Sequence, residues 1–220
     1  MKKPLIRRWS EPTASRSASQ LILPSLEQRL SFAPRPRCAD ASVLLALTDE
    51  PDPRVLLTRR SMQLNHHAGE VSLPGGKRDP ADTSNIVVAL REAHEETGLD
   101  PFAVRLLGEL PSQRARSGLW VKPIVGVIPP DYPLVAQPSE IDRIFYVRLT
   151  ELMLRPPQPY QIELNGRTMA VPSFQIDDEI IWGLTGRILV AMLQRGLGHR
   201  IDWPLFLMRY AAAKTPKFKE

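Results

Sequence analysis

The sequence has 220 residues, 43% of them hydrophobic, and a formal net charge of +5. A chain of this length can bury one sizeable core but hardly two, so we expect one folded domain with tails. No apolar run reaches the roughly 18 to 20 residues that span a bilayer, and the first residues lack the apolar stretch of a signal peptide, so we expect a cytoplasmic protein with no membrane partner.

The positive charge belongs to the two ends of the chain. Residues 1–20 contain five basic residues and one acidic residue, and residues 195–220 contain six and two, so the stretch between them is net negative. We expect residues 1–20 to form a disordered or loosely docked arm, residues 21–200 the folded domain and residues 201–220 a basic tail. No nucleic-acid partner is expected, and nucleic-acid binding is an alternative that rests on the tails alone.

The first part of the expected domain reads as a helix followed by short strands. The helix is predicted over Ser25–Phe32, and strands over Ala41–Leu47 and Arg54–Thr58 form a hairpin around a polar, proline-containing loop. A further short strand over Gly69–Leu73 is stopped by Pro74-Gly75-Gly76. The two glycines permit backbone conformations and a close ligand approach that side chains forbid.

The strongest helix signal in the chain follows a polar loop over Lys77–Asp82. Thr83 or Ser84 is a suitable N-cap, apolar residues recur at helical spacing, and Gly98 is a suitable C-terminal stop. The pattern therefore predicts a helix that ends just before Gly98.

Strand composition returns in the second half of the chain. Strands are predicted over Val104–Leu110, Leu119–Ile128, Ile144–Leu149, Tyr160–Leu164 and Thr168–Phe174, the last two as a hairpin around Asn165-Gly166. Helical spacing then predicts a helix over Ile180–Leu193. Mixed strands with one central and one late helix indicate an α+β sandwich rather than a doubly wound sheet.

Three glutamates lie on or beside one face of the central helix. Glu92 and Glu96 are one turn apart, and Glu95 is three residues from Glu92. Like charges at this spacing destabilise a bare helix by about a few tenths of a kcal/mol per pair, a cost that a divalent cation removes. Mg²⁺ prefers carboxylate, water and phosphate oxygens, so this face beside a glycine loop is typical of a diphosphate site. An ordinary solvated helix face is the alternative for these residues alone.

The surrounding residues resemble the box of the Nudix hydrolase family, G-x5-E-x7-R-E-U-x-E-E-x-G-U, in which U is aliphatic. Arg91 to Leu99 match its second half, with the small Ala93 at one U position. The first half departs: counted from Gly76, Asp82 stands in place of the glutamate, and eight residues rather than seven separate it from Arg91. The resemblance implies a Nudix-like α/β/α sandwich with a mixed sheet and a central loop–helix motif.

The same resemblance implies a role for each matching residue. Glu92, Glu95 and Glu96 would bind Mg²⁺ or Mn²⁺, with the Gly75 carbonyl as a further ligand, and Arg91 would orient a carboxylate. Glu92 is alternatively the catalytic base. In several relatives a glutamate from a later loop is ligand or base, and Glu140 is the candidate here, with a surface carboxylate as its alternative. The expected catalytic residues are Glu92, Glu96 and Glu140.

A narrower resemblance covers Leu56 to Gly76. This segment is similar to the signature of the coenzyme A diphosphatase subgroup, L-L-T-x-R-[SA]-x3-R-x3-G-x3-F-P-G-G, although Asn65 replaces its arginine and Leu73 its phenylalanine. The resemblance implies hydrolysis of coenzyme A or acyl-CoA to 3′,5′-ADP and (acyl-)4′-phosphopantetheine. It implies three substrate-binding residues: Arg60, Gly75 and Gly76. A solvated strand-end arginine is the alternative for Arg60.

Asn65 keeps a second enzymatic interpretation open, because it removes a cation that could meet a phosphate. That interpretation is a Nudix diphosphatase acting on ADP-ribose, NADH or another nucleoside diphosphate derivative. A non-catalytic nucleotide sensor is less favoured, because it gives no reason to keep three mutually repelling carboxylates. A homodimer is an open assembly state. Surface or packing roles are expected for His66, His67 and His94, a core position for Trp182, and an inert thiol for Cys38.

Overall fold

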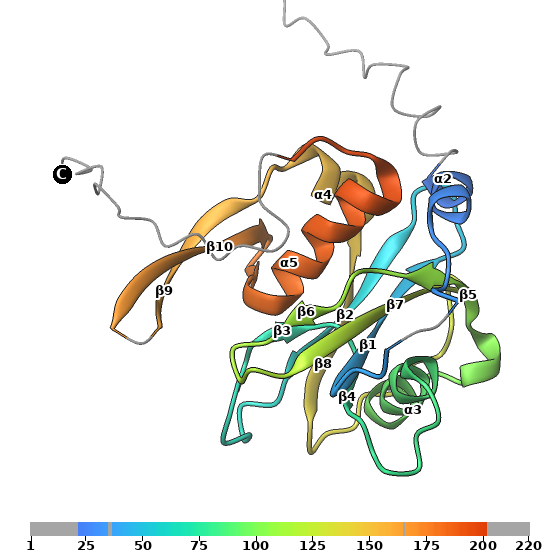
Figure 1. Ribbon diagram of the computed structural model, residues 1–220, viewed down its shortest axis with the longest axis horizontal. Coiled ribbons are helices and arrows are strands. Elements are labelled where there is room, and N and C mark those ends of the chain that lie inside the picture. Colours follow the sequence, from blue (N-terminus) through green and yellow to red (C-terminus); the bar gives the residue numbers. More distant parts are fainter. Residues whose placement is uncertain (1–21, 35–36, 165, 202–220) are drawn as a thin grey trace, which may run out of the picture.

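The computed structural model describes residues 22–34, 37–164 and 166–201. The predicted N-terminal arm and all of the predicted basic tail except Ile201 lie outside these residues. Helices cover both faces of a mixed sheet, with α3 on one face and α4 and α5 on the other (Figure 1). The predicted α+β class and the α/β/α layering are therefore confirmed. Within the described ranges, no helix combines the length and apolar character that a membrane crossing needs.

The main sheet has eight strands, five of which follow the order β3-β2-β1-β7-β5. Strand β4 also pairs with β1, β6 with β7 and β8 with β2. The pairing of β1 with β7 is parallel and the other pairings are antiparallel. The strands are β1 Ala41–Thr48, β2 Arg54–Arg60, β3 Val71–Ser72, β4 Gly75–Lys77, β5 Arg105–Glu109, β6 Gln113–Arg114, β7 Trp120–Ile128 and β8 Ile141–Arg148.

Strand β1 is apolar on both sides because each face of the sheet is covered. Leu44 and Ala46 belong to the core cluster beneath α3, whereas Leu45 and Leu47 belong to the cluster on the opposite face. This alternation follows from the two-residue period of a strand. The predicted hairpin of β1 and β2 is confirmed by the pairing of Leu47 with Val55.

Helix α3, Asn85–Thr97, forms where the capping residues predict it. The Ser84 hydroxyl accepts a hydrogen bond from the Val87 N–H at 3.1 Å, and Gly98 adopts the left-handed conformation with φ 68°. Ala89 and Ala93 are fully buried, and their small side chains let the helix lie close to the sheet. The acidic residues of the helix are thereby fixed relative to the sheet.

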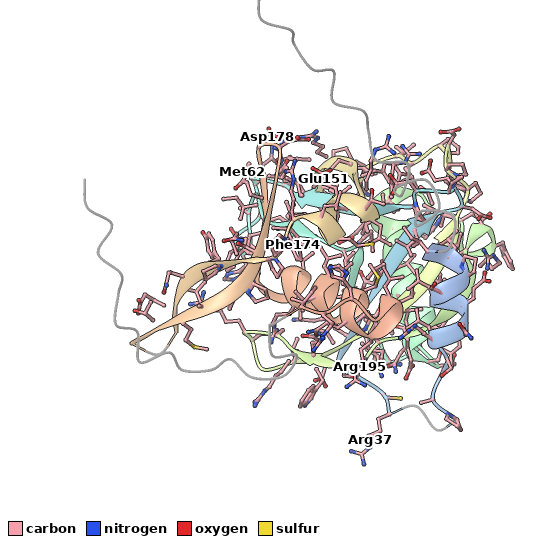
Figure 2. All side chains as sticks on the ribbon, turned by 90° about the horizontal axis from the view of Figure 1, so that it is seen from above. Arg37, Met62, Glu151, Phe174, Asp178 and Arg195 are labelled. Atoms are coloured by element: carbon pink, nitrogen blue, oxygen red, sulfur yellow. The ribbon has the colours of Figure 1, made fainter. Side chains whose placement is uncertain are left out.

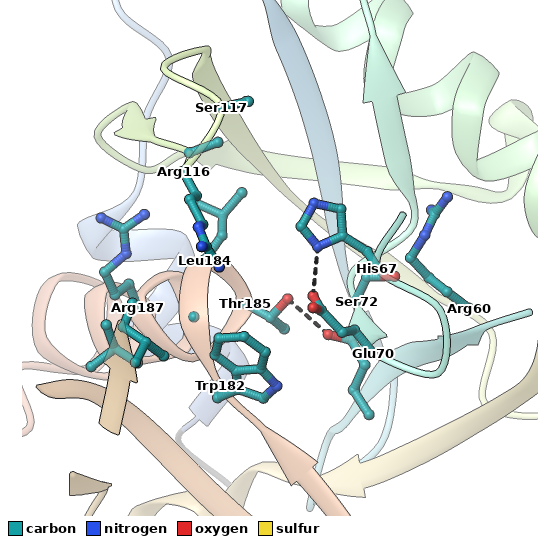
Figure 3. Close-up of a pocket in the computed structure, with 15 residues that line it drawn as sticks. Arg60, His67, Glu70, Ser72, Arg116, Ser117, Trp182, Leu184, Thr185 and Arg187 are labelled. Carbon is teal, nitrogen blue, oxygen red and sulfur yellow. Dashed lines mark hydrogen bonds and ion pairs between the residues drawn. The ribbon is translucent and has the colours of Figure 1, made fainter. Parts of the chain in front are cut away.

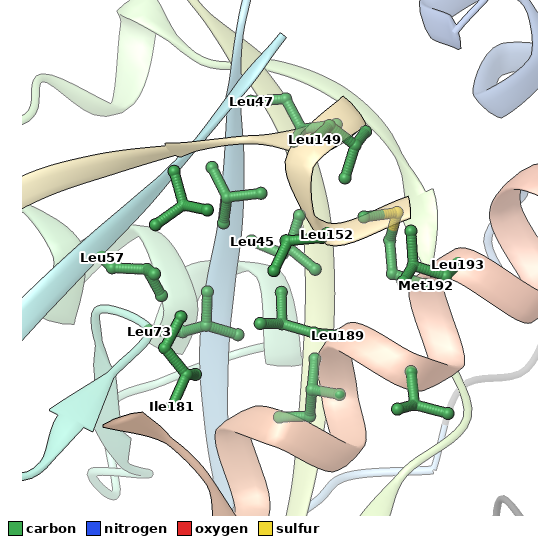
Figure 4. Packing of buried hydrophobic residues seen from close by; sticks show 14 of the residues in the cluster. Leu45, Leu47, Leu57, Leu73, Leu149, Leu152, Ile181, Leu189, Met192 and Leu193 are labelled. Atoms are coloured by element: carbon green, nitrogen blue, oxygen red, sulfur yellow. The ribbon is translucent and has the colours of Figure 1, made fainter. Parts of the chain in front are cut away.

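The opposite face is covered by α2 Ile22–Arg29, α4 Leu149–Leu154 and α5 Gly183–Ala191, which continues into a π-helical turn, η2 Met192–Gly196. Figure 4 shows Leu189, Met192 and Leu193 facing Leu45 and Leu152 in this core. These packed apolar side chains attach the C-terminal helix to the sheet.

A second sheet, of order β11-β10-β9, extends from the body (Figure 1). Its strands are β9 Gln158–Leu164, β10 Arg167–Ile176 and β11 Glu179–Ile181. The predicted hairpin is confirmed by the pairing of Leu164 with Arg167, although Asn165 lies outside the described residues. In Figure 2, Phe174 of β10 lies among packed side chains, whereas Asp178 in the following turn lies at the periphery.

Several predicted boundaries were wrong. The first helix begins and ends about one turn earlier than predicted, a 3-10 turn (η1, Pro101–Ala103) precedes β5, and Leu149 begins helix α4 instead of ending a strand. Ile180 and Ile181 belong to β11, where they pair with Gln175 and Phe174 of β10. The helix predicted over Ile180–Leu193 therefore starts only at Gly183. A run of apolar residues does not distinguish a short buried strand from the first turn of a helix.

Candidate active site

The carboxylates of Glu92 and Glu96 lie against a glycine strand. Gly75 and Gly76 were predicted as a stop, but they form β4 and pair with Val43 and Ser42 of β1. The Gly75 N–H donates a hydrogen bond to Glu96 Oε2 at 3.1 Å. A Cβ atom on Gly76 would lie 2.4 Å from the Glu92 carboxyl carbon. Glycine at both positions lets the backbone approach both carboxylates.

Burial makes Glu96 hard to ionise. Its side chain is 3% exposed. Desolvation is the largest influence and raises the pKa of Glu96 to about 7, with like charges on Glu140 and Glu92 acting in the same direction. The Gly75 N–H and the Arg60 guanidinium, 3.6 Å from Glu96 Oε1, oppose that rise. Burial likewise raises the pKa of Glu92, against the lowering effect of Arg91. The two residues form a pair of mutually repelling carboxylates, of which Glu96 is buried and Glu92 partly buried.

Arg91 joins the helix to the preceding loop. Its Nε and Nη2 donate to the two carboxylate oxygens of Asp82 at 3.2 and 2.9 Å, and Nη2 also donates to the Lys77 carbonyl at 3.1 Å. Nη2 lies 3.1 Å from Glu92 Oε1. The loop that is one residue longer than the family pattern therefore still gives Arg91 a carboxylate partner, and that partner is Asp82.

Glu95 differs from the other two glutamates. Its side chain is 55% exposed and accepts a hydrogen bond from Arg91 Nη1 at 2.9 Å. Among the side chains that the structure describes, no three His, Cys, Asp or Glu residues are grouped closely enough to hold a metal ion. Glu92 and Glu96 thus share the glycine strand, while Glu95 lies at its edge with Arg91.

A later loop brings Glu140 to this site. The carbonyls of Glu96 and Thr97, left free at the end of α3, accept hydrogen bonds from the Gln137 and Val135 N–H groups at 2.9 Å each. The Glu140 carbonyl accepts a hydrogen bond from the Ser61 N–H at 2.8 Å. The exposed Glu140 is close enough to raise the pKa of both Glu92 and Glu96.

A cavity of about 250 Å³ has Arg60, the cation that lies 3.6 Å from Glu96 Oε1, as part of its wall. Figure 3 shows Trp182 between Arg60 and His67 on one side and Arg116 and Arg187 on the other. Trp182 was predicted in the core, which is wrong: it is half-buried, lines the cavity and packs against the Tyr160 ring with centroids 4.8 Å apart. No local sequence pattern predicts this cavity, because its walls come from separate segments.

Three histidines and the single cysteine lie at the surface. His66, His67 and His94 are exposed, and His67 Nδ1 lies 2.9 Å from a carboxylate oxygen of Glu70. Cys38 is a free, exposed thiol. Among the described residues, none of these four side chains forms a recorded hydrogen bond with the carboxylates of Glu92, Glu95 or Glu96.

The NUDIX domain family matches residues 39–164. A protein of Photorhabdus laumondii named "Uncharacterized Nudix hydrolase NudL" is 40% identical over 177 residues, which cover 80% of this chain and 92% of the relative. A protein of the same name from Escherichia coli is 40% identical over 150 residues, covering 68% and 78%. A solved MutT/nudix family protein from Enterococcus faecalis matches with a TM-score of 0.48 at 13% identity, covering 87% of this chain and 76% of that one.

Proposed function

The chain belongs to the Nudix hydrolase family, and from this premise we propose that it hydrolyses the diphosphate linkage of coenzyme A or an acyl-CoA to 3′,5′-ADP and (acyl-)4′-phosphopantetheine. Nudix hydrolases cleave diphosphate linkages in small nucleotide-derived substrates with the help of divalent metal ions. The choice of coenzyme A is the finer part of the proposal and rests on the residues around the site.

The observation that carries the proposal is the position of Arg60. Its guanidinium lies 3.6 Å from Glu96 Oε1, and the same residue is part of the wall of the cavity that contains Trp182. A substrate phosphate at this point would meet a fixed cation beside the α3 carboxylates. The rest of a nucleotide would extend along the aromatic and apolar wall of the cavity. Arg60 therefore connects the carboxylates of α3 with the cavity that would hold the rest of the nucleotide.

The donor set fits a hard divalent cation. Glu92 and Glu96 present carboxylate oxygens beside the neighbouring glycines of β4, and the Gly75 carbonyl is a further candidate ligand. Glu95 would join them after exchanging its contact with Arg91. Bound Mg²⁺ or Mn²⁺ would supply charge neutralisation at the phosphate oxygens and acidify a water molecule.

The remaining chemistry falls to side chains of this chain. Water forms a bond to one phosphorus, the bond from that phosphorus to the bridging oxygen breaks, and the proton passes to a carboxylate. Glu92 and Glu140 are the two candidates for that base. Arg60 holds a phosphate in line, while Arg91 and Asp82 keep Glu92 in position.

A panel of diphosphates tests the proposal. We expect purified protein with Mg²⁺ or Mn²⁺ to convert coenzyme A to 3′,5′-ADP faster than it converts ADP-ribose or NADH, with products resolved by chromatography. Glu96→Gln serves as the inactive control. Faster turnover of ADP-ribose would overturn the choice of coenzyme A, and nucleotide binding without any hydrolysis would favour the sensor interpretation.

The ADP-ribose or NADH alternative has one observation in its favour. Asn65, where the subgroup signature has arginine, is exposed in the loop after β2 and brings no charge to the site. An Asn65→Arg variant should then gain activity on coenzyme A relative to ADP-ribose. No gain would show that the existing arginines already meet the substrate.

A further inference from the structure

The cavity beside the active site has a second cationic end. Arg187 on α5 and Arg116 in the loop after β6 lie on the side of Trp182 that is away from Arg60 (Figure 3). Arg116 lies within the family-matched segment, whereas Trp182 and Arg187 come from the chain beyond it. The C-terminal elements therefore complete a pocket that the matched part of the chain does not form alone.

Arg187 is a desolvated cation with no anionic partner. In the described part of the chain, no carboxylate lies within ion-pair distance of it, its Nε is buried, and that Nε donates to no acceptor. Its Nη2 donates to the Arg114 carbonyl at 2.6 Å, which holds the guanidinium against β6. Burial lowers the pKa of Arg187, because desolvation disfavours its charged form. Holding this cation in the cavity wall therefore costs stability.

Arg116 is a second cation on this wall that lacks a carboxylate partner among the described residues. It is exposed, and its recorded contact is a hydrogen bond from Nη2 to the Glu163 carbonyl at 3.3 Å. Over the described residues it, too, has no carboxylate within ion-pair distance. Two arginines without counter-ions on one cavity wall are suited to an anion with several acceptor oxygens, and a phosphomonoester is such an anion.

The arrangement separates two anion positions by an aromatic surface. Arg60 marks the first beside Glu96, and Arg187 with Arg116 marks the second. Trp182 lies between them, and its ring is backed by Tyr160. A nucleotide with a diphosphate on O5′ and a phosphate on O3′ presents two anions and a base around a single ribose, and a cavity wall with two cationic positions and an aromatic ring offers a partner for each of the three groups.

We propose that Arg187 and Arg116 form a second anion subsite that binds the 3′-phosphate of coenzyme A while the adenine lies against Trp182. This inference rests on the proposed function and gives it a source of specificity, because ADP-ribose and NADH lack that phosphate. It also explains why the position of the missing subgroup arginine, Asn65, can remain neutral.

Two nucleotides that differ in a single group test the subsite by binding alone. We expect adenosine 3′,5′-bisphosphate to bind the wild-type protein at least roughly tenfold more tightly than AMP in calorimetry, since a charge-assisted pair to a phosphate is worth about that factor. Arg187→Met should abolish the difference, and Arg187→Lys should retain part of it. Arg105→Met, at the distant β5 edge, is the matched control and should leave the ratio unchanged.

The melting temperature distinguishes a loss of folding from a loss of nucleotide binding in these variants. Arg187 is half-buried and has no carboxylate partner, so replacing it by an apolar side chain of similar size should leave the melting temperature equal or higher. Arg116→Ala offers an exposed second variant with the same expected loss of preference. Equal or absent binding of both nucleotides to wild type, or an intact preference in Arg187→Met, would overturn the subsite.

Failure of the subsite and failure of the proposed function give different results. Coenzyme A hydrolysis without any preference for the bisphosphate would leave the function and remove the subsite. Preference for the bisphosphate without coenzyme A hydrolysis would support the subsite and contradict the proposed function.

Discussion

The guanidinium of Arg91 donates two hydrogen bonds to the carboxylate of Asp82, from Nε to Oδ1 at 3.2 Å and from Nη2 to Oδ2 at 2.9 Å. The Asp82 side chain is 3% exposed, and the hydrogen bond from Arg91 holds its pKa below the ordinary value of 3.8. Asp82 thus fixes the arginine that also contacts Glu92.

Replacing Asp82 should release Arg91. We expect Asp82→Asn to reduce kcat by about tenfold and to lower the melting temperature, because a charge-assisted pair becomes a neutral one. Asp79→Asn is the matched control: its side chain is 66% exposed and 3.9 Å from Arg91 Nη2. Equal losses in the two variants would contradict a special role for Asp82.

The raised pKa of Glu96 predicts a pH-dependent stability. The folded protein, with a pKa of about 7, binds this proton more tightly than the unfolded chain, with about 4.5. The group therefore stabilises the fold fully below pH 4.5, and that contribution is lost as the pH rises through 7. Urea unfolding in EDTA should show the metal-free wild type losing up to about 3 kcal/mol between pH 5 and 8 relative to Glu96→Gln. Parallel pH profiles for the two proteins would refute this.

Divalent metal should stabilise the protein through Glu92 and Glu96 more than through Glu95. We expect Mg²⁺ or Mn²⁺ to raise the wild-type melting temperature by mass action and EDTA to reverse the rise. Glu92→Gln and Glu96→Gln should abolish the rise, whereas Glu95→Gln should reduce it least, because that side chain is exposed and paired with Arg91. Glu151→Gln on α4 is the control. A loss in Glu95→Gln as large as in Glu96→Gln would show that Glu95 is an equal ligand.

Alanine substitutions at the two glycines of β4 should impair the protein in different ways. Gly76→Ala places a methyl group 2.4 Å from the Glu92 carboxyl carbon, so the carboxylate must move; we expect a folded protein with kcat lowered by roughly 100-fold. Gly75→Ala meets the backbone oxygen of Ser42 at 2.4 Å and needs φ 154°, so we expect poor folding. Circular dichroism and activity together distinguish the two, and an active Gly76→Ala protein would contradict the close packing of Glu92.

Arg60 and Glu140 should shift the pKa of Glu96 in opposite directions. The Arg60 cation lowers it and the Glu140 carboxylate raises it. A carboxyl-carbon NMR titration of the metal-free protein should therefore give a higher pKa for Glu96 in Arg60→Met and a lower one in Glu140→Gln. Shifts of the same sign would mean that one of these side chains lies farther from Glu96 than the structure records.

Patterns within one element were sufficient to predict helix α3. Ser84 and Gly98 cap it because their preferences are local, and the helical period places Glu92 and Glu96 one turn apart in any fold. The alternating faces of β1 and the hairpin to β2 depend likewise on short-range pattern. Gly75 and Gly76 were recognised as permissive positions, but their pairing with β1 was not, since it joins residues more than 30 apart.

The central helix, its acidic face, the α+β class and the family were therefore predictable from the amino-acid sequence, because all of them depend on residue spacing along a continuous segment. The folded structure was needed to show that Asp82 holds Arg91, that the loop before Glu140 docks on the end of α3, and that Trp182 and Arg187 line a cavity rather than the core. These contacts join distant segments through sheet pairing and burial. Their free energy depends on which surfaces meet, and residue spacing along the chain carries no information about that.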